Sequence, residues 1–206
     1  KLKKYYPRNY EGESNYINNL GQVNLKEGKW LILSRTKSNL LSIMEELRRK
    51  NIYYQSNKGK SFTVSLYKAA VSYTKWKMFE PIEPTEINDI NEYILNSADW
   101  SREKEWYDVF YQADQKEVLY IRNMLADGEK LNQDARVFVS TIHAAKGGEE
   151  DNVILSLHQS SKVQKGIKQS VDKQDEEHRV WYVGISRARN NLYKLKAKQR
   201  TKEYQL

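Results

Sequence analysis

The apolar and polar positions of the chain fall into blocks that predict alternating strands and helices. Lys29 to Arg35 (KWLILSR) is a nearly continuous apolar run and is a predicted buried strand. Ser38 to Lys50 has apolar residues at helical spacing, with Ser38 as the expected N-cap, and Ile52 to Gln55 is extended again. One face of the predicted helix carries Leu40, Met44 and Leu47. This strand, helix, strand order indicates a parallel α/β layer.

The last third of the chain repeats this pattern. Arg136 to Thr141 (RVFVST) and Asn152 to Leu157 (NVILSL) are predicted strands because they are apolar and rich in β-branched residues. We predict a helix from about Asp175 to Arg189 and a final strand from Asn191 to Lys198. Ser161 to Gln174 is polar and lacks a strong period, so we interpret it as a mobile surface loop.

The middle of the chain, roughly Ser65 to Gln133, has helical periodicity throughout, which favours a helical insertion in the α/β domain. Gly128 is expected to end its last helix. Two apolar stripes are predicted, formed by Ile87, Ile90 and Ile94 and by Val118, Ile121 and Leu125. The aromatic residues here could stack on nucleic-acid bases, but burial in a core is the commoner role of such rings. They include Trp76, Trp100, Trp106, Tyr107, Phe110 and Tyr111.

Composition narrows the class of protein. The 206 residues suffice for one sizeable core, and 30% charged with 39% hydrophobic residues is a globular composition. Without cysteine, disulfides, thiolate zinc sites and cysteine nucleophiles are excluded. No apolar run is long enough to span a membrane, and we expect a cytosolic protein, in a bacterial or viral setting. The net charge of +8 favours a polyanionic partner but is also compatible with a basic surface of no specific function.

Gly59, Lys60 and Ser61 resemble the end of a phosphate-binding loop, but the first glycine of that motif is missing. Tyr54 occupies its place, and no strand leads into a glycine-rich turn. We interpret this segment as a polar turn before the helical insertion.

Val139 to Val153 (VSTIHAAKGGEEDNV) follows a predicted strand at the carboxyl edge of the sheet, where α/β folds place ligands. Thr141 and His143 can donate hydrogen bonds to phosphate oxygens, and Lys146 adds a positive charge. Gly147 and Gly148 allow close backbone approach. These residue types suit a phosphodiester or a nucleotide, but they equally suit a turn held by its own hydrogen bonds.

Glu176 to Leu192 (EEHRVWYVGISRARNNL) places Arg179, Val183 and Arg187 at helical spacing on one expected face. Arginine recognises phosphate in a bidentate manner, and an arginine that reaches a nucleotide held elsewhere can complete phosphoryl transfer. The alternative is a solvated helix face on which Glu176 and Glu177 pair with the arginines.

Together the two stretches resemble motifs V and VI of the UvrD/Rep-like superfamily 1 DNA helicases. The T-x-H-x-x-K-G-x-E pattern of motif V is matched by Thr141, His143, Lys146, Gly147 and Glu149. The E-E-x-R-x-x-Y-V-x-x-[TS]-R-A pattern of motif VI is matched by Glu176, Glu177, Arg179, Tyr182, Val183, Ser186, Arg187 and Ala188, where Ser186 replaces the commoner threonine. The resemblance covers about Lys29 to Phe62 and Arg136 to Lys198, and includes the strand that ends in Ser34, Arg35 and Thr36.

The resemblance implies a second RecA-like domain, an α/β fold with a parallel sheet like that of P-loop NTPases but without the P-loop. Its expected parts are residues 1–62 and 135–206, which form the sheet, and a small helical insertion at 63–134. It implies that Arg187 reaches the γ-phosphate of ATP and that Glu149 and Gly148 also lie at the nucleotide. Thr141, His143 and Lys146 would contact single-stranded DNA. Gly147, Arg179 and Tyr182 would have structural or coupling roles.

The resemblance also implies ATP and Mg²⁺, bound mainly by an N-terminal RecA-like domain that this sequence does not contain. The expected partners are that domain and single-stranded DNA or a duplex junction, in DNA repair or replication, with no membrane partner. We expect this chain alone to be inactive. An ATP-independent binding module and the helicase part of a helicase-nuclease remain alternatives. The basic segment Lys194 to Lys202 could contact a DNA backbone or keep an edge strand soluble.

Overall fold

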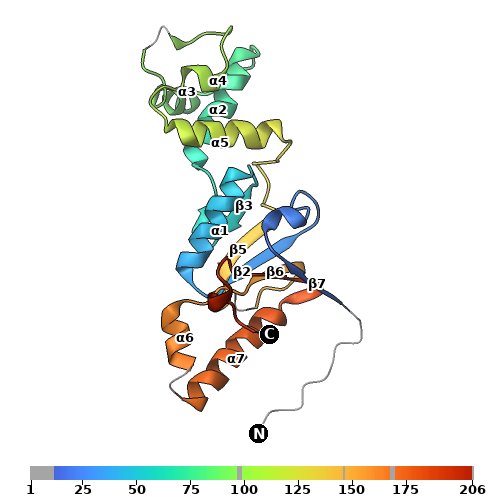
Figure 1. Cartoon of the computed structure of the whole chain (residues 1–206). Helices are drawn as coiled ribbons and strands as arrows, with labels where there is room; N and C mark the ends of the chain where they lie inside the picture. Colours follow the sequence, from blue (N-terminus) through green and yellow to red (C-terminus); the bar gives the residue numbers. More distant parts are fainter. Residues whose placement is uncertain (1–11, 97–98, 146, 168–169, 206) are drawn as a thin grey trace. The chain divides into compact units, whose positions relative to one another are not determined.

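A computed structural model describes residues 12–96, 99–145, 147–167 and 170–205 of the chain. The chain divides into two compact units (Figure 1). The sheet unit contains the residues up to Glu46, Tyr54–Asn57 and the residues from Arg136 onward. The helical unit contains Leu47–Tyr53 and Lys58–Ala135. The segment Leu47–Tyr53 therefore joins the helical unit, although it lies before the predicted insertion at 63–134.

The sheet unit is built on parallel strands in the order β1-β7-β6-β2-β5-β3. Their bounds are Glu13–Ile17 (β1), Trp30–Ser34 (β2), Tyr54–Ser56 (β3), Val137–Thr141 (β5), Glu150–Ser156 (β6) and Ala188–Leu195 (β7). All residues of β2 are buried, which is expected of a central parallel strand covered on both faces. This architecture confirms the predicted α/β fold with a RecA-like parallel sheet.

Helix α1 (Lys37–Arg49) follows β2 and buries Ile43 and Leu47, while Leu40 and Met44 are half-buried. The prediction that Ser38 is its N-cap is wrong. The Thr36 hydroxyl instead accepts a hydrogen bond from the Asn39 backbone N–H at 3.3 Å, the interaction that an N-cap side chain makes.

The predicted loop from Ser161 to Gln174 is also wrong, because α6 (Ser161–Ile167) and the start of α7 (Val171–Ile185) occupy it. Serine hydroxyls precede both helices and accept backbone hydrogen bonds. Ser160 accepts from the Val163 N–H at 3.3 Å, and Ser170 accepts from the Lys173 N–H at 3.2 Å. Capping by serine was the sequence signal for these helices.

Helix α7 ends before the predicted boundary at Arg189, and β7 begins at Ala188 rather than Asn191. Strand β7 lies between β1 and β6, so it is not an edge strand. The interpretation of the basic segment after Lys194 as protection of an edge is therefore wrong. The segment continues into a short 3₁₀ helix, η3 (Arg200–Lys202), and another 3₁₀ helix, η1 (Leu20–Gln22), follows β1.

The helical unit contains β4 (Gly59–Lys60), α2 (Val64–Lys77), α3 (Pro84–Asn91), α4 (Trp106–Val109) and α5 (Gln115–Ala126). Its core confirms the burial of most of the aromatic cluster. Trp106 and Phe110 are buried, and Trp76, Trp100 and Tyr107 pack against the core. Tyr111 is instead 52% exposed.

The predicted apolar stripes of the helical unit are only partly correct. Buried members are Ile90, Ile94, Val118 and Ile121, although Ile94 lies beyond the end of α3. Ile87 and Leu125 are exposed. Gly128 follows α5 with φ +82°, as expected for a residue that ends a helix. Among the described residues, no helix is both long and apolar enough to cross a membrane.

Candidate functional site

The segment between β5 and β6 runs from the carboxyl edge of the sheet, where the parallel strands end, to the amino edge, where they begin. Thr141 ends β5 in register with Ser34 of β2, and Ser34 is in register with Ser156 at the carboxyl end of β6. The segment enters β6 at its other end, where Glu150 pairs with Ala188. Along β6, six residue steps separate Glu150 from Ser156, a distance of roughly 20 Å at the usual rise per residue of a strand. The residues of the motif therefore belong to two places rather than one.

At the carboxyl edge, a single tight turn presents His143 to solvent. The Thr141 backbone oxygen accepts hydrogen bonds from the Ala144 and Ala145 N–H groups, both at 3.0 Å. The Thr141 hydroxyl accepts a further bond from Ala144 N–H at 3.2 Å. Buried Ile142 anchors the turn, since its N–H donates to the Ser34 oxygen at 3.0 Å. His143 itself is exposed, so its imidazole is available to a ligand.

The two glycines after this turn have different roles. Gly147 has φ +88°, a left-handed conformation that favours glycine. Gly148 has no such requirement, and a Cβ placed on it would make ordinary contact with the Ala145 oxygen at 3.6 Å. Lys146, an expected DNA contact, lies outside the described residues.

At the amino edge, backbone pairing brings Glu149 and Arg187 into adjacent positions. The Glu150 N–H donates to the Arg187 oxygen at 3.1 Å. The Glu149 carboxylate lies 3.7 Å from Nε of Arg189, and both of these side chains are substantially exposed. This edge therefore holds the Glu149 carboxylate, followed by Glu150 and Asp151 at the start of β6, and the side chains of Arg187 and Arg189. Carboxylates and guanidinium groups can bind the sugar hydroxyls and the phosphates of a nucleotide.

The prediction that Arg179, Val183 and Arg187 share one helix face is wrong. Helix α7 ends at Ile185, and Ser186 is its C-cap. Arg187 lies in the connection to β7, where its N–H donates to the Gly184 oxygen at 3.3 Å. Arg179 is exposed on α7, and Tyr182 is 47% exposed. The structure therefore separates Arg187 from Arg179.

Arg187 carries a polar atom without a hydrogen-bond partner. Its Nε is buried, and no acceptor for it exists in the described part of the chain. Buried donors of this kind are nearly always satisfied in native proteins, so an orphan one needs an explanation. Because this nitrogen is shielded from solvent, an anionic ligand at the amino edge would supply the missing acceptor only after the Arg187 side chain had moved.

Glu177 pairs with Arg35 rather than with Arg179 or Arg187. The alternative in which Glu177 pairs with the arginines of its own motif on a solvated helix face is therefore wrong. The Arg35 guanidinium donates to both carboxylate oxygens of Glu177, at 2.9 and 3.1 Å from Nε and 2.9 Å from Nη2. The Trp181 indole N–H donates to the same carboxylate at 2.8 Å. Glu177 is buried, whereas Glu176 is exposed. This pair fixes α7 to the carboxyl end of β2, a role that sequence reasoning missed.

Contact between α7 and the sheet is also close at Gly184. A Cβ placed there would lie 2.9 Å from Cδ1 of Leu155, a fully buried residue of β6. Glycine at this position lets the helix backbone approach the sheet closely.

The parallel sheet and its two polar edges define a RecA-like domain of the helicase type. Residues 64–199 match the family model of the UvrD-like helicase C-terminal domain, and the chain belongs to this family. No curated protein matches the chain.

Proposed function

We propose that this chain is the C-terminal motor domain of an ATP-dependent DNA helicase that unwinds duplex DNA by moving along single-stranded DNA. The observation that carries the proposal is the separation of its polar residues between the two edges of one sheet. A translocating motor needs one site for the nucleotide and another for the track, joined by a short connection.

The nucleotide would bind at the amino edge. Arg187 would donate hydrogen bonds from its guanidinium group to the γ-phosphate of ATP. Glu149 would accept hydrogen bonds from the ribose hydroxyls, and Gly148 would allow close approach of the backbone. ATP and Mg²⁺ would be held mainly by a first RecA-like domain of the same protein. Hydrolysis of the bound ATP would supply the free energy for movement.

The DNA would bind at the carboxyl edge. His143 is exposed on a turn whose backbone hydrogen bonds hold it in place. Thr141 and His143, with Lys146, would contact phosphates of a single strand, and phosphate contacts give affinity without sequence selectivity. Gly147 would allow the connection between the two edges to change direction.

The test is reconstitution with the first RecA-like domain, followed by measurement of ATP hydrolysis with and without oligo(dT). We expect Arg187→Ala to lower DNA-stimulated hydrolysis by roughly three orders of magnitude, the usual range for loss of an arginine that completes phosphoryl transfer. Arg187→Lys should restore little of it, because lysine lacks the planar fork. Arg49→Ala, which removes an exposed arginine of α1, is the matched control and should leave hydrolysis unchanged.

The two edges also predict a separation of effects. Arg187→Ala should keep the affinity for oligo(dT), and His143→Ala should weaken that affinity while DNA-independent hydrolysis stays near its original rate. If the reconstituted protein bound DNA but hydrolysed no ATP with Arg187 intact, the motor proposal would be refuted. A binding module that works without ATP would then replace it.

A further inference from the structure

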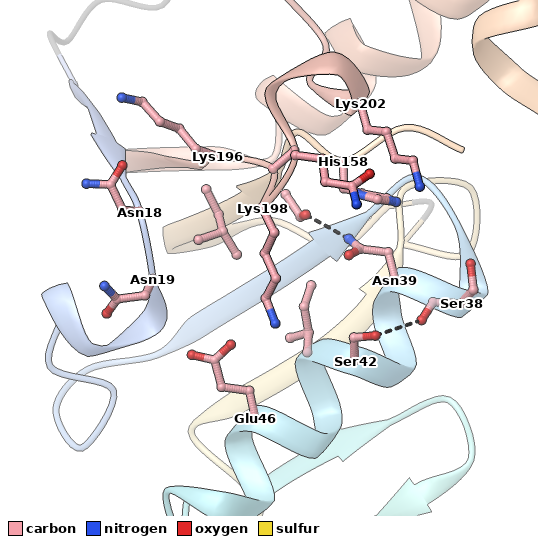
Figure 2. Close-up of a pocket in the computed structure, with 15 residues that line it drawn as sticks. Asn18, Asn19, Ser38, Asn39, Ser42, Glu46, His158, Lys196, Lys198 and Lys202 are labelled. Carbon is pink, nitrogen blue, oxygen red and sulfur yellow. Dashed lines mark hydrogen bonds between the residues drawn. The ribbon is translucent and has the colours of Figure 1, made fainter. Parts of the chain in front are cut away.

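A second polar feature lies on the carboxyl edge of the sheet, beside the ends of β1, β7, β6 and β2. It is a pocket of about 370 Å³ between the start of α1 and the segment that follows β7 (Figure 2). Its lining includes Ser38, Asn39 and Ser42 from α1, and Lys196, Lys198 and Lys202 from the segment after β7. Motifs V and VI do not include the lysines of this segment.

The lysines are held on an ordered loop. The loop leaves the sheet at Leu195, whose oxygen accepts from the Leu157 N–H at 2.9 Å, and it returns at Tyr204, whose N–H donates to the Leu157 oxygen at 2.9 Å. The Tyr204 ring stacks on Trp181 with centroids 4.5 Å apart and planes at 8°. Within the loop, Ala197 N–H donates to the Glu203 carboxylate at 3.1 Å. Both ends of the loop are therefore fixed over the carboxyl edge.

The pocket is positively charged. Figure 2 shows the Lys198 side chain directed into the pocket toward α1, and Lys202 above Asn39 beside His158. Burial and the neighbouring Lys202 charge lower the pKa of His158 below its ordinary 6.5, so the imidazole is neutral near pH 7. Glu46 is the one carboxylate among the residues that line the pocket. The Lys196 side chain points away from the pocket, toward the Tyr16 ring, so Lys198 and Lys202 against one carboxylate leave an excess of positive charge (Figure 2).

The polar groups on the α1 side are preorganised. The Asn39 amide donates to the Ser34 hydroxyl at 2.9 Å and to the Ser156 hydroxyl at 2.7 Å, which fixes its orientation at the ends of β2 and β6. Hydroxyls of Ser38 and Ser42 line the same side. Both N–H groups of the Asn39 amide are used in these bonds, so the donors available to phosphate oxygens are the ammonium groups and the serine hydroxyls.

We propose that Lys198 and Lys202 bind phosphodiester groups of single-stranded DNA in this pocket and so extend the track that begins at His143. The inference rests on the proposed function, since it assumes that DNA crosses the carboxyl edge. From β5, which leads to His143, to β7 there are three strand spacings, or roughly 14 Å, so one strand can contact both places. Lysines bind phosphate as point charges, and the pocket therefore adds affinity without selecting a sequence.

The experiment measures binding of the full chain to fluorescein-labelled oligo(dT) by anisotropy, between about 50 and 200 mM salt, the range in which phosphate contacts are most apparent. Each phosphate contact on a single strand contributes about 0.7 to the slope of log K against log salt, so Lys198→Ala/Lys202→Ala should reduce the slope by roughly 1.4. If the lost contacts are electrostatic, this corresponds to an affinity about 25-fold lower at roughly 0.1 M salt. Glu46→Gln should instead tighten binding.

The matched control is Lys26→Ala/Lys29→Ala, which removes the same charge before β2, at the opposite edge of the sheet. It should leave the slope unchanged, because distant charges are screened at these salt concentrations. Far-UV circular dichroism and the urea midpoint of each variant show whether it is folded.

The outcomes separate this inference from the proposed function. If His143→Ala weakens binding but Lys198→Ala/Lys202→Ala keeps the original slope, the pocket inference is wrong and the DNA track at His143 stands. If the unaltered chain does not bind oligo(dT) at low salt, both are wrong. Displacement of oligo(dT) by inorganic phosphate at matched ionic strength, abolished in the double lysine variant, would show a site for free phosphate and would also overturn the inference.

Discussion

Removal of the Glu177 carboxylate tests the structural account of α7 most directly. In Glu177→Ala, the Arg35 guanidinium loses three hydrogen bonds and the Trp181 indole N–H loses its acceptor. The side chains of Glu177 and Arg35 are 7% and 21% exposed, so water replaces these contacts only in part.

The size of the effect follows from this burial. Breaking a buried ion pair by removing one partner costs about 3–5 kcal/mol. We expect a value near the lower end of this range, because the Arg35 side chain retains some access to water. An indole N–H left without an acceptor adds about 1 kcal/mol or more. We expect a total loss of about 3–4 kcal/mol in the free energy of unfolding of the sheet unit. For a chain of this length, that lowers the melting temperature by roughly 6–16 °C.

Glu176→Ala is the matched control, because it removes the neighbouring, exposed carboxylate from the same helix. Its effect should stay within about 0.5 kcal/mol. Urea unfolding should be followed by both circular dichroism and tryptophan fluorescence, since two compact units can unfold in separate transitions. Equal midpoints for the two glutamate variants would refute the reasoning that the Arg35 pair holds α7 on the sheet.

Two further predictions concern single positions. Gly147→Ala should lower stability by about 1 kcal/mol, because φ is +88° while open space surrounds the added methyl group, and Gly148→Ala should cost less in the same urea titration. Hydrogen bonds from the Glu83 N–H, the Ser72 hydroxyl and Lys75 hold the pKa of Glu86 at about 2, below its ordinary 4.5. The stability that the ionised Glu86 carboxylate contributes is fully present above pH 4.5 and is lost as the pH falls toward 2. The melting temperatures of the original chain and Glu86→Gln should therefore converge over that range.

The sheet was predictable where its strands are buried and apolar. The bounds of β2 and β5 agree with the predicted strands to within one residue at each end, because central parallel strands are continuous apolar runs. Strand β1 was not predicted. Its sequence, ESNYI, is polar and four of its five residues are exposed, as an edge position allows. Its strand conformation depends on pairing with β7, which is distant in sequence.

The sequence motifs predicted which residues form the candidate site, but not how those residues are arranged in space. Helical periodicity was extended through Arg187, although the pairing of β7 with β6 ends the helix at Ile185. The partner of Glu177 was equally hidden, since Arg35 lies 142 positions earlier and only the fold brings them together. The residue types indicated that the site binds phosphate. Only the register of the strands shows that the motif residues are divided between the carboxyl edge and the amino edge of the sheet.

The connection between the two edges is formed by hydrogen-bonded turns, and this bears on how a motor of the proposed kind would couple its sites. In the first turn, the Thr141 oxygen accepts from the Ala144 and Ala145 N–H groups. A second turn follows directly, because the Gly148 N–H donates to the Ala145 oxygen at 3.0 Å. Glu149 comes immediately after this second turn, and His143 lies within the first. A displacement of Glu149 at the nucleotide edge would therefore act on a connection held by its own hydrogen bonds rather than on a free loop, and so on the turn that carries His143.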